Sequence, residues 1–177
     1  MTNPLDRVVA EERFRSVFTH LGAVAAYARR RGHRDADALA AEVMAIAWRR
    51  LADVPADDPR PWLFATARNL VHADARRAQP AVGELDVATA AHEHGALELD
   101  AHLEVALRSL SRADREALLL VAWEDLTPGQ AARSLGINPT AFRVRLLRAR
   151  RRLRARLDDT SADRRSEPKT NLDMETT

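Results

Sequence analysis

Cysteine is missing from the 177 residues of the chain, which excludes a disulfide framework and a thiolate-ligated metal site. Aromatic residues make up only 5%, and no apolar run approaches the roughly 20 residues that a membrane-spanning helix needs. Residues 1–10 lack the apolar core of a secretory signal peptide. β-Branched residues are also few, whereas Ala, Leu, Arg and Glu dominate. These shortages predict a soluble, cytoplasmic, all-α protein without membrane contact of its own.

Motifs for catalysis or cofactor binding are absent as well. The sequence contains no glycine-rich phosphate loop, no HExxH zinc motif, and no nucleophile with a suitably spaced histidine and carboxylate. His92, Glu93, His94 and His102 resemble a metal cluster, but no fourth ligand stands at a known spacing, which favours a solvated polar segment. We therefore predict that the protein is not an enzyme and that it holds neither a cofactor nor a metal.

Charge is unevenly distributed along the chain, although the net charge is only +2. Residues 1–77 carry a net charge of +3 and residues 78–104 carry −6. Residues 105–157 carry +8, and residues 158–177 carry −3. This alternation of basic and acidic blocks predicts two binding domains joined by an acidic linker.

Two helix starts lie close together in the basic C-terminal block. Thr127 can cap a helix, Gln130 completes a capping box, and Gly136 can end that helix by adopting a positive φ. Asn138 is the cap of a second helix, with Pro139 in its first turn. Two helices joined by a short turn that contains glycine form the helix-turn-helix pattern.

The second of these helices is predicted to extend to Leu157 and to be amphipathic. Its apolar stripe, at spacings of three and four, consists of Phe142, Leu146, Ala149, Leu153 and Leu157. The remaining face carries Arg143, Arg145, Arg148, Arg150, Arg151, Arg152, Arg154 and Arg156. A solvated basic helix is the plain alternative. The two caps, the glycine turn and the one-sided arginines together favour binding to DNA.

Two further helices are predicted upstream of this motif, at residues 101–109 and 112–124. Ser111 is the cap of the second one. Tryptophan among leucine and valine is more often buried than exposed. We therefore expect all three tryptophans in the core, namely Trp48, Trp62 and Trp123.

The helix-turn-helix residues resemble the −35-reading domain of bacterial sigma factors of the extracytoplasmic-function (ECF) group. That family's pattern runs close to LSxxEIAxxLGIPxGTVKSRLxRARxxL. The residues that fit it are Leu126, Ala132, Leu135, Gly136, Ile137, Arg145, Leu146, Arg148, Ala149, Arg150 and Leu153. Asp125, Val144 and Leu147 depart from it. Other regulators carry similar motifs, so a second match is needed.

The N-terminal block is predicted to contain three helices, at residues 8–31, 35–51 and 62–77, with Gly32 as a C-cap. Three helices in some 70 residues can bury a small but viable core. Prolines and aspartates mark a loop at residues 52–61. Its adjacent carboxylates, Asp57 and Asp58, are interpreted as ordinary loop residues.

This block resembles the N-terminal domain of ECF sigma factors. DADALAAEVMAIAWRRL is similar to the family's AEDLxQExFLRAWR helix, and PRPWLFATARNLVHADARR is similar to its PRxWLxxIARNLxxDxxRR segment. The agreeing residues are Asp37, Leu39, Glu42, Ala47, Trp48, Arg49, Pro59, Arg60, Trp62, Leu63, Ala67, Arg68, Asn69, Leu70, Arg76 and Arg77. Ala38 and Ala41 replace two polar residues of the family pattern.

The resemblance implies an all-α chain of two small helical domains. Residues 1–77 would bind core polymerase and recognise and melt the −10 element. Residues 78–100 would be a flexible acidic linker, and residues 101–157 would read the −35 element. Residues 158–177 are expected to be disordered, because they are polar and lack aromatics. The implied partners are core RNA polymerase, promoter DNA and an anti-sigma factor.

Site residues follow from the matched motifs and from helical phase. For the −35 element they are Thr140, Arg143, Val144, Leu147, Arg148, Arg151 and Arg152. For the −10 element they are Arg68, Asn69, Arg76 and Arg77, and for core polymerase Asp37, Glu42 and Arg49. The alternative is a stand-alone helix-turn-helix repressor or activator, which would leave the segment PRPWLFATARN unexplained.

Overall fold

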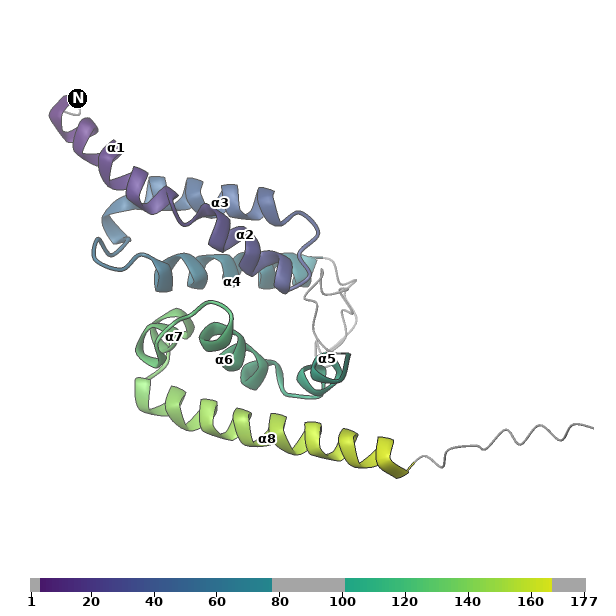
Figure 1. Cartoon of the computed structure of the whole chain (residues 1–177). Helices are drawn as coiled ribbons and strands as arrows, with labels where there is room; N and C mark the ends of the chain where they lie inside the picture. The colour runs from purple at the N-terminus through teal and green to yellow at the C-terminus, as the bar shows by residue number, and fades with distance from the viewer. Residues whose placement is uncertain (1–3, 78–100, 167–177) are drawn as a thin grey trace, which may run out of the picture.

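The computed structural model describes residues 4–77 and 101–166, and the regular structure in these ranges is helical throughout (Figure 1). The prediction of an all-α fold is therefore confirmed. The first range forms one bundle of helices and the second range forms another. The two bundles are stacked as two layers.

The N-terminal domain contains α1 (Pro4–Phe18), α2 (Leu21–Arg30), α3 (Ala36–Arg49) and α4 (Arg60–Arg77). A short 3₁₀ helix, η1 (Leu51–Asp53), follows α3. Helix α2 packs against both α3 and α4, whereas α1 packs mainly against α3. The domain therefore rests on α2 as its central element.

Small side chains at the helix contacts let these helices approach closely. Ala28, Ala40 and Ala67 are completely buried, one each on α2, α3 and α4. Tyr27 is also completely buried, and its ring stacks on Phe64 with 5.3 Å between the ring centroids. Aromatic pairs add roughly 0.5–1.5 kcal/mol beyond their area burial. The few aromatics of the chain are thus concentrated where they stabilise the core.

The sequence pattern predicted one helix over residues 8–31, and this prediction is wrong. The chain breaks between α1 and α2, within residues 18–21. The hydroxyl of Thr19 donates a hydrogen bond of 2.7 Å to the backbone oxygen of Ser16. Such side-chain-to-backbone bonds compete with helix propagation. The break redirects α2 so that its apolar face packs on α3 and α4.

Two predicted boundaries of this domain are confirmed, the helix start near Asp35 and the turn at Gly32. Asp35 caps α3 by accepting a hydrogen bond of 2.9 Å from the backbone nitrogen of Ala38. Gly32, just after α2, has a φ of 70°, a conformation that glycine adopts at no steric cost. The turn between α2 and α3 is therefore encoded locally.

The C-terminal domain contains α5 (Ala101–Arg108), α6 (Arg112–Ala122), α7 (Pro128–Leu135) and α8 (Pro139–Ser166). The long α8 packs against each of the other three. Asp125, in the loop between α6 and α7, has a φ of 51°, which aspartate tolerates better than most residues. The pair α7 and α8 is the predicted helix-turn-helix.

Each predicted cap of this motif is present. Thr127 and Gln130 form a reciprocal capping box, with 2.7 Å from the Thr127 nitrogen to the Gln130 amide oxygen. Gly136 ends α7 in the left-handed conformation with a φ of 64°. Asn138 accepts a bond of 2.8 Å from the nitrogen of Thr140 at the start of α8. Local chemistry alone therefore sets both helix starts.

The predicted apolar stripe of α8 faces the core of its domain. Phe142, Leu146 and Ala149 are buried, and Leu153 and Leu157 are half-buried. The helix does not end at the predicted position, because it continues to Ser166. Adding residues to an existing helix avoids the cost of nucleation, so a polar sequence can extend it. The predicted start of a disordered tail after residue 157 is therefore wrong.

The two domains lie against each other, mainly through α4 and α7 (Figure 1). Their buried apolar residues form one continuous cluster. The proposed flexible linker lies outside the described residues and stays a prediction. The sequence patterns did not predict this contact between the domains.

Candidate nucleic-acid interfaces and the contact between the domains

The start of α8 presents the predicted −35 residues on one exposed face. All of them are exposed, namely Thr140, Arg143, Val144, Leu147, Arg148, Arg151 and Arg152. Val144 is 43% exposed and Leu147 60%, which is unusual for large apolar side chains. An exposed strip of this kind, bordered by arginines, can meet apolar atoms of a ligand as well as its anionic groups.

Arg152 differs from the other arginines of this face. It donates a hydrogen bond to the carboxylate of Asp114, which is buried in the first turn of α6. Ser111 caps that turn by accepting a bond of 3.2 Å from the nitrogen of Asp114. Arg152 therefore ties α8 to α6. Within residues 4–77 and 101–166, Arg143, Arg148 and Arg151 make no ion pair.

The predicted −10 residues are divided between two environments. Asn69, Arg76 and Arg77 are exposed on α4. Arg68 is half-buried, and its Nε is buried with no hydrogen-bond partner among the described residues. Burial raises the pKa of Glu116 on α6, but Arg31, Tyr27 and, to a smaller extent, the positive charge of Arg68 lower it. Arg68 is thus more buried than the exposed group of Asn69, Arg76 and Arg77.

His72, one turn beyond Arg68 on α4, lies in the same region. Burial lowers its pKa to about 4, with further lowering by the charges of Arg112 and Arg68. An imidazole in these surroundings is neutral at physiological pH. This part of the molecule therefore holds several cationic side chains close together and favours the uncharged form of the histidine.

The predicted polymerase-binding residues lie on α3. Asp37, Glu42 and Arg49 are all exposed. Glu42 and Arg49 are two helical turns apart and share a face. Beside them, Trp48 is 43% exposed, so its predicted place in the core is wrong. Its ring makes an edge contact with Phe14, with 5.1 Å between the ring centroids.

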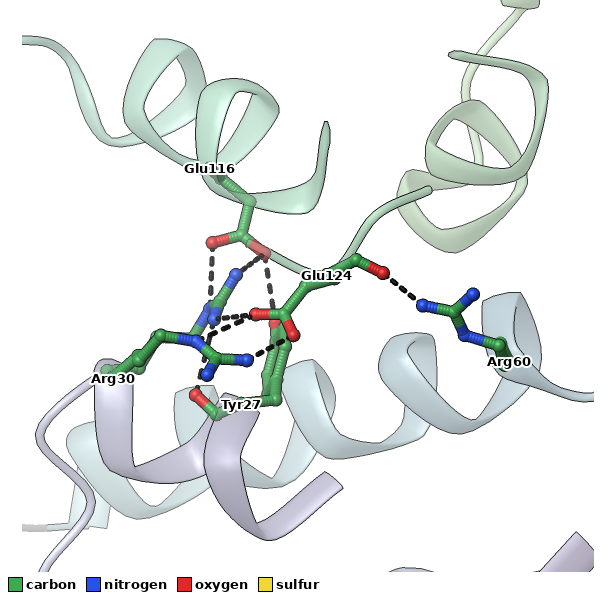
Figure 2. A network of polar contacts seen from close by, with 6 residues as sticks. Tyr27, Arg30, Arg60, Glu116 and Glu124 are labelled. Atoms are coloured by element: carbon green, nitrogen blue, oxygen red, sulfur yellow. Dashed lines mark hydrogen bonds and ion pairs between the residues drawn. The ribbon is translucent and has the colours of Figure 1, made fainter. Parts of the chain in front are cut away.

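Glu124 stands at the centre of the contact between the domains (Figure 2). Its carboxylate accepts hydrogen bonds from Arg30 and from Arg31, with 3.1 Å between Arg31 Nη1 and Glu124 Oε1. Its backbone oxygen accepts a hydrogen bond from Arg60. The Glu124 side chain is 2% exposed, and a charge so buried requires such partners.

Glu116 forms the second part of this contact. Arg31 binds it in a bidentate manner with one edge of the guanidinium, at 3.0 Å from Nε to Oε2 and 3.0 Å from Nη2 to Oε1. The hydroxyl of Tyr27 donates a bond of 2.9 Å to the same carboxylate. The guanidinium carbon of Arg31 also lies 3.4 Å from the centroid of the Tyr27 ring. Arg31 is therefore held by an ion pair, by a bidentate hydrogen bond and by stacking on the Tyr27 ring.

The pKa values of these groups are shifted by burial and by their partners. Burial alone would lower the pKa of Arg31, but the carboxylates of Glu116 and Glu124 raise it overall. Burial alone would raise the pKa of Glu116, but Arg31 holds it below its ordinary value. Burial raises the pKa of Tyr27 well above its usual range. Glu116 and Arg31 are therefore charged at neutral pH, and the phenol of Tyr27 is neutral.

A third part of the contact joins the loop after η1 to α7. The carboxylate oxygen Oδ2 of Asp58 lies 3.0 Å from Nε2 of Gln130 and 2.7 Å from Nη2 of Arg133. The interpretation of Asp58 as an ordinary loop carboxylate is therefore wrong. Nothing near Asp58 in the sequence signals this role, since both partners lie more than 70 residues away.

No described helix is both long enough and apolar enough to cross a membrane. In the same residues, no group of three metal-ligating side chains is brought together. His102 of the proposed polar cluster lies on α5, and His92, Glu93 and His94 lie outside the described residues.

Comparisons with known proteins cover most of the chain. Residues 102–153 match the family model of sigma-70 region 4. CnrH, solved in complex with the cytosolic domain of CnrY, is 27% identical; the match covers 87% of this chain and 97% of CnrH, with a TM-score of 0.59. The sigma factor RpoE of Bartonella quintana, solved with the anti-sigma factor NepR, is 22% identical. That match covers 81% of this chain and 95% of RpoE, with a TM-score of 0.58.

No curated protein matches the chain at a significant level. The region 4 match and the similar structures nevertheless confirm the resemblance to ECF sigma factors. They also confirm the expected function, which is promoter-specific initiation of transcription. The family is one of transcription initiation factors that are not enzymes.

Proposed function

Since this chain has the helix-turn-helix domain and the fold of an ECF sigma factor, we propose that it directs core RNA polymerase to promoters by reading −35 and −10 elements. The carrying observation is the exposed face of α8, where Arg143, Arg148 and Arg151, which make no ion pair among the described residues, border two exposed apolar residues within the region 4 match. Such a face fits the major groove, which admits one helix and offers both phosphates and thymine methyls.

On α8, we assign base reading to the first turns and phosphate binding to the later ones. Thr140, Arg143, Val144 and Leu147 lie early enough to reach base edges. Val144 and Leu147 cannot hydrogen-bond to a base, so they should favour thymine methyls. Arg148 and Arg151 would hold phosphates, which position a protein without reading sequence. Arg152 was expected to do the same, but its bond to Asp114 supports a role within the domain.

On α4, we assign −10 recognition to Asn69, Arg76 and Arg77, with Arg68 joining them when the domains separate. Strand opening without ATP requires capture of unpaired bases in a pocket beside a basic groove. Asn69 is exposed and offers both a donor and an acceptor to a base edge. The loop at residues 52–61 would supply the pocket.

Docking on core polymerase is assigned to the exposed side of α3. Glu42 and Arg49 would provide charged contacts, with Asp37 at the start of the helix. A cytoplasmic location and the absence of a cofactor accord with this function. The structure of RpoE with NepR supports a further proposal, that an anti-sigma factor holds this protein inactive.

The first experiment compares transcription and polymerase binding of the wild type, Glu42→Lys and, as a matched control, the exposed Glu12→Lys on α1. Charge reversal at an exposed site should change the free energy of unfolding by only about 0.5 kcal/mol. Like charges that face each other across an interface can cost several kcal/mol, so Glu42→Lys should lose co-purification with core polymerase and run-off transcription. Glu12→Lys should retain both.

A folded Glu42→Lys protein with wild-type transcription would move the docking surface elsewhere. In the same assay, Asn69→Ala should bind duplex DNA normally but show fewer permanganate-reactive thymines in open complexes, and unchanged melting would refute its assignment. If the wild type binds no bacterial core polymerase and footprints a palindrome by itself, the protein is instead a stand-alone regulator.

A further inference from the structure

We infer that Arg13 of α1 is a positioning residue for −10 recognition, because it holds the start of the loop at residues 52–61 through the backbone oxygen of Val54. This inference rests on the proposed function, in which that loop supplies the pocket for an unpaired base. It has three supports. The bond fixes the point where the loop begins, Arg13 makes no other hydrogen bond or ion pair among the described residues, and the bond lies within one domain.

Val54 is the residue at which η1 ends and the extended part of the loop begins. Its φ of −76° and ψ of 121° are extended, and its nitrogen donates a bond of 3.3 Å to the oxygen of Leu51 in η1. Its own oxygen accepts a bond from Nη2 of Arg13, which lies 41 positions earlier in the chain. Val54 is also only 1% exposed. With both backbone groups bonded, Val54 fixes the direction in which the loop leaves η1.

Arg13 is placed differently from the other arginines of α1. Arg7 and Arg15 are exposed and pair with glutamates of the same helix. Arg13 is half-buried, and its Nε is buried without a hydrogen-bond partner among the described residues. A buried charge without a carboxylate partner is costly, and an apolar side chain of similar size is often better tolerated. The bond to Val54 therefore accounts for the arginine better than the stability of the core does.

Beyond Val54, the hydrogen bonds of the loop come from elsewhere. Residues 55–57 are exposed, and Asp58 accepts its hydrogen bonds from α7 of the C-terminal domain. Before Val54, η1 is closed by Arg50, whose Nε lies 2.9 Å from Oδ2 of Asp53. The bond from Arg13 joins two parts of the N-terminal domain, so it does not depend on the arrangement of the two domains. Arg13 thus anchors the loop within its own domain.

Reading an unpaired base requires that donors and acceptors stay in place. Hydrogen bonds weaken steeply when their angles are poor, and a misplacement of about 1 Å by a distant substitution can cost roughly 100-fold in rate. A loop without its anchor could still contact a base, but it would have to be ordered on binding and would accept other bases more readily. Loss of Arg13 should therefore reduce the selectivity for −10 bases.

The experiment uses the full-length chain with the bacterial core RNA polymerase that the wild type binds. Arg13→Met removes the donor but keeps an unbranched side chain in the buried space. Arg15→Met is the matched control, since it removes an exposed arginine of the same helix. Melting curves show that each variant is folded.

Two readouts are compared. Hydrogen–deuterium exchange of the free protein reports on the order of residues 56–58. Run-off transcription from promoter libraries randomised at the −10 or the −35 element gives the preference at each base position. A residue that only stabilises the core would change the total yield of transcript but not the relative preference among −10 bases.

We expect residues 56–58 to exchange at least about tenfold faster in Arg13→Met than in Arg15→Met, because exchange reports local opening. The ratio between the best and the worst base should fall at least about fivefold at one −10 position, since a displaced hydrogen-bonding site discriminates less well. The −35 preference should not change. Arg13→Lys should fall between Arg13→Met and the wild type, because an ammonium group can still donate to Val54.

Faster exchange with an unchanged −10 preference would overturn the positioning role, and unchanged exchange would overturn the anchor itself. If Arg13→Met does not fold, Arg13→Lys decides the test, and exchange and −10 preference equal to those of Arg15→Met would overturn the inference. Failure of the proposed function is distinct. It would appear as no core-dependent transcription by the wild type from any library member, while exchange still tests the anchor.

Discussion

Arginines play opposite roles in two regions of this protein. At the contact between the domains, Arg31 is 10% exposed and binds two carboxylates of the other domain. On the outer face of α8, Arg151 is exposed and makes no ion pair within the described residues. Both belong to basic segments of the sequence. The comparison shows that the local density of charge in the sequence does not distinguish an exposed arginine available to a polyanion from one that holds two domains together.

The physical basis of this difference is desolvation. A guanidinium loses its water only where a carboxylate of matching geometry replaces it, as Glu116 does for Arg31. Exposed arginines such as Arg151 keep their hydration, and under the proposed function they would exchange counterions for phosphates on binding DNA. We therefore expect the contact between the domains to depend on the first group and affinity for DNA to depend on the second.

The largest effect should come from Arg31→Ala. It would leave Glu116 and Glu124 buried without their shared partner. If the domains stayed together, this loss would cost roughly 3–5 kcal/mol. The domains should separate instead, because the carboxylates then regain water. Small-angle X-ray scattering should show a larger radius of gyration than for the wild type. Arg31→Lys should fall between them, since lysine lacks the planar fork.

The matched control on the other face is Arg151→Ala, which should leave the radius of gyration unchanged. An Arg31→Ala protein as small as the wild type would show that Arg31 does not hold the domains together.

A smaller effect is expected from pH, through His72. Its pKa is lowered to about 4 by burial and by the charges of Arg112 and Arg68, from about 6.5 in an exposed histidine. A lowered pKa means that the closed form is favoured above the ordinary pKa and loses that advantage as the pH falls toward 4. The pKa of Glu116 is lowered as well, so protonation of Glu116 also weakens the closed form. This occurs only as the pH falls below the ordinary pKa of a carboxyl group.

The interdomain contact should therefore weaken between pH 6.5 and 5 and stay constant between pH 7 and 9. This is measured by fluorescence energy transfer between labels on Ala45→Cys of α3 and Ala155→Cys of α8, both exposed positions. His72→Gln should flatten most of this dependence. His20 contributes the remainder, because burial and then Arg60 lower its pKa too. An equally steep profile for His72→Gln would assign the effect to other groups.

The smallest effects on structure should come from the arginines of α8. Arg151→Ala should change the free energy of unfolding by less than about 0.5 kcal/mol. It should weaken binding to all DNA sequences alike and reduce the slope of log K against log salt by about 0.9, the value for one phosphate contact. Arg143→Ala should instead relax the preference at one base position. These are measured with a set of −35 variants at several salt concentrations.

If Arg143→Ala and Arg151→Ala each lose the same affinity on every −35 variant, the division between base reading and phosphate binding is contradicted.

Much of the fold could be predicted because its signals are local. The capping box of Thr127 and Gln130, the left-handed Gly136 and the Asp35 cap each involve residues only a few positions apart. Their geometry depends on backbone and side-chain chemistry within one turn of helix. The apolar stripe of α8 follows equally from a period of 3.6 residues. The all-α class and the helix-turn-helix were determined by the sequence for this reason.

Several features depended on the tertiary structure. Trp48 is exposed although its neighbours in the sequence are apolar, because helix packing decides which face is covered. The break at residues 18–21 competes with a helix period that continues through it. Both errors arose where a local pattern was compatible with two arrangements.

The contact between the domains is the clearest case of this limit. Arg30 and Glu124 are 94 positions apart, and Asp58 and Arg133 are 75 apart. Neither residue of such a pair carries a local signal, since charged residues of both signs are common on solvated helices. By itself, the sequence determined the helices, their caps and the family pattern through short-range chemistry. Only the packing of the two domains decided which carboxylates meet which arginines, because that choice depends on long-range geometry and on which charges lose their water.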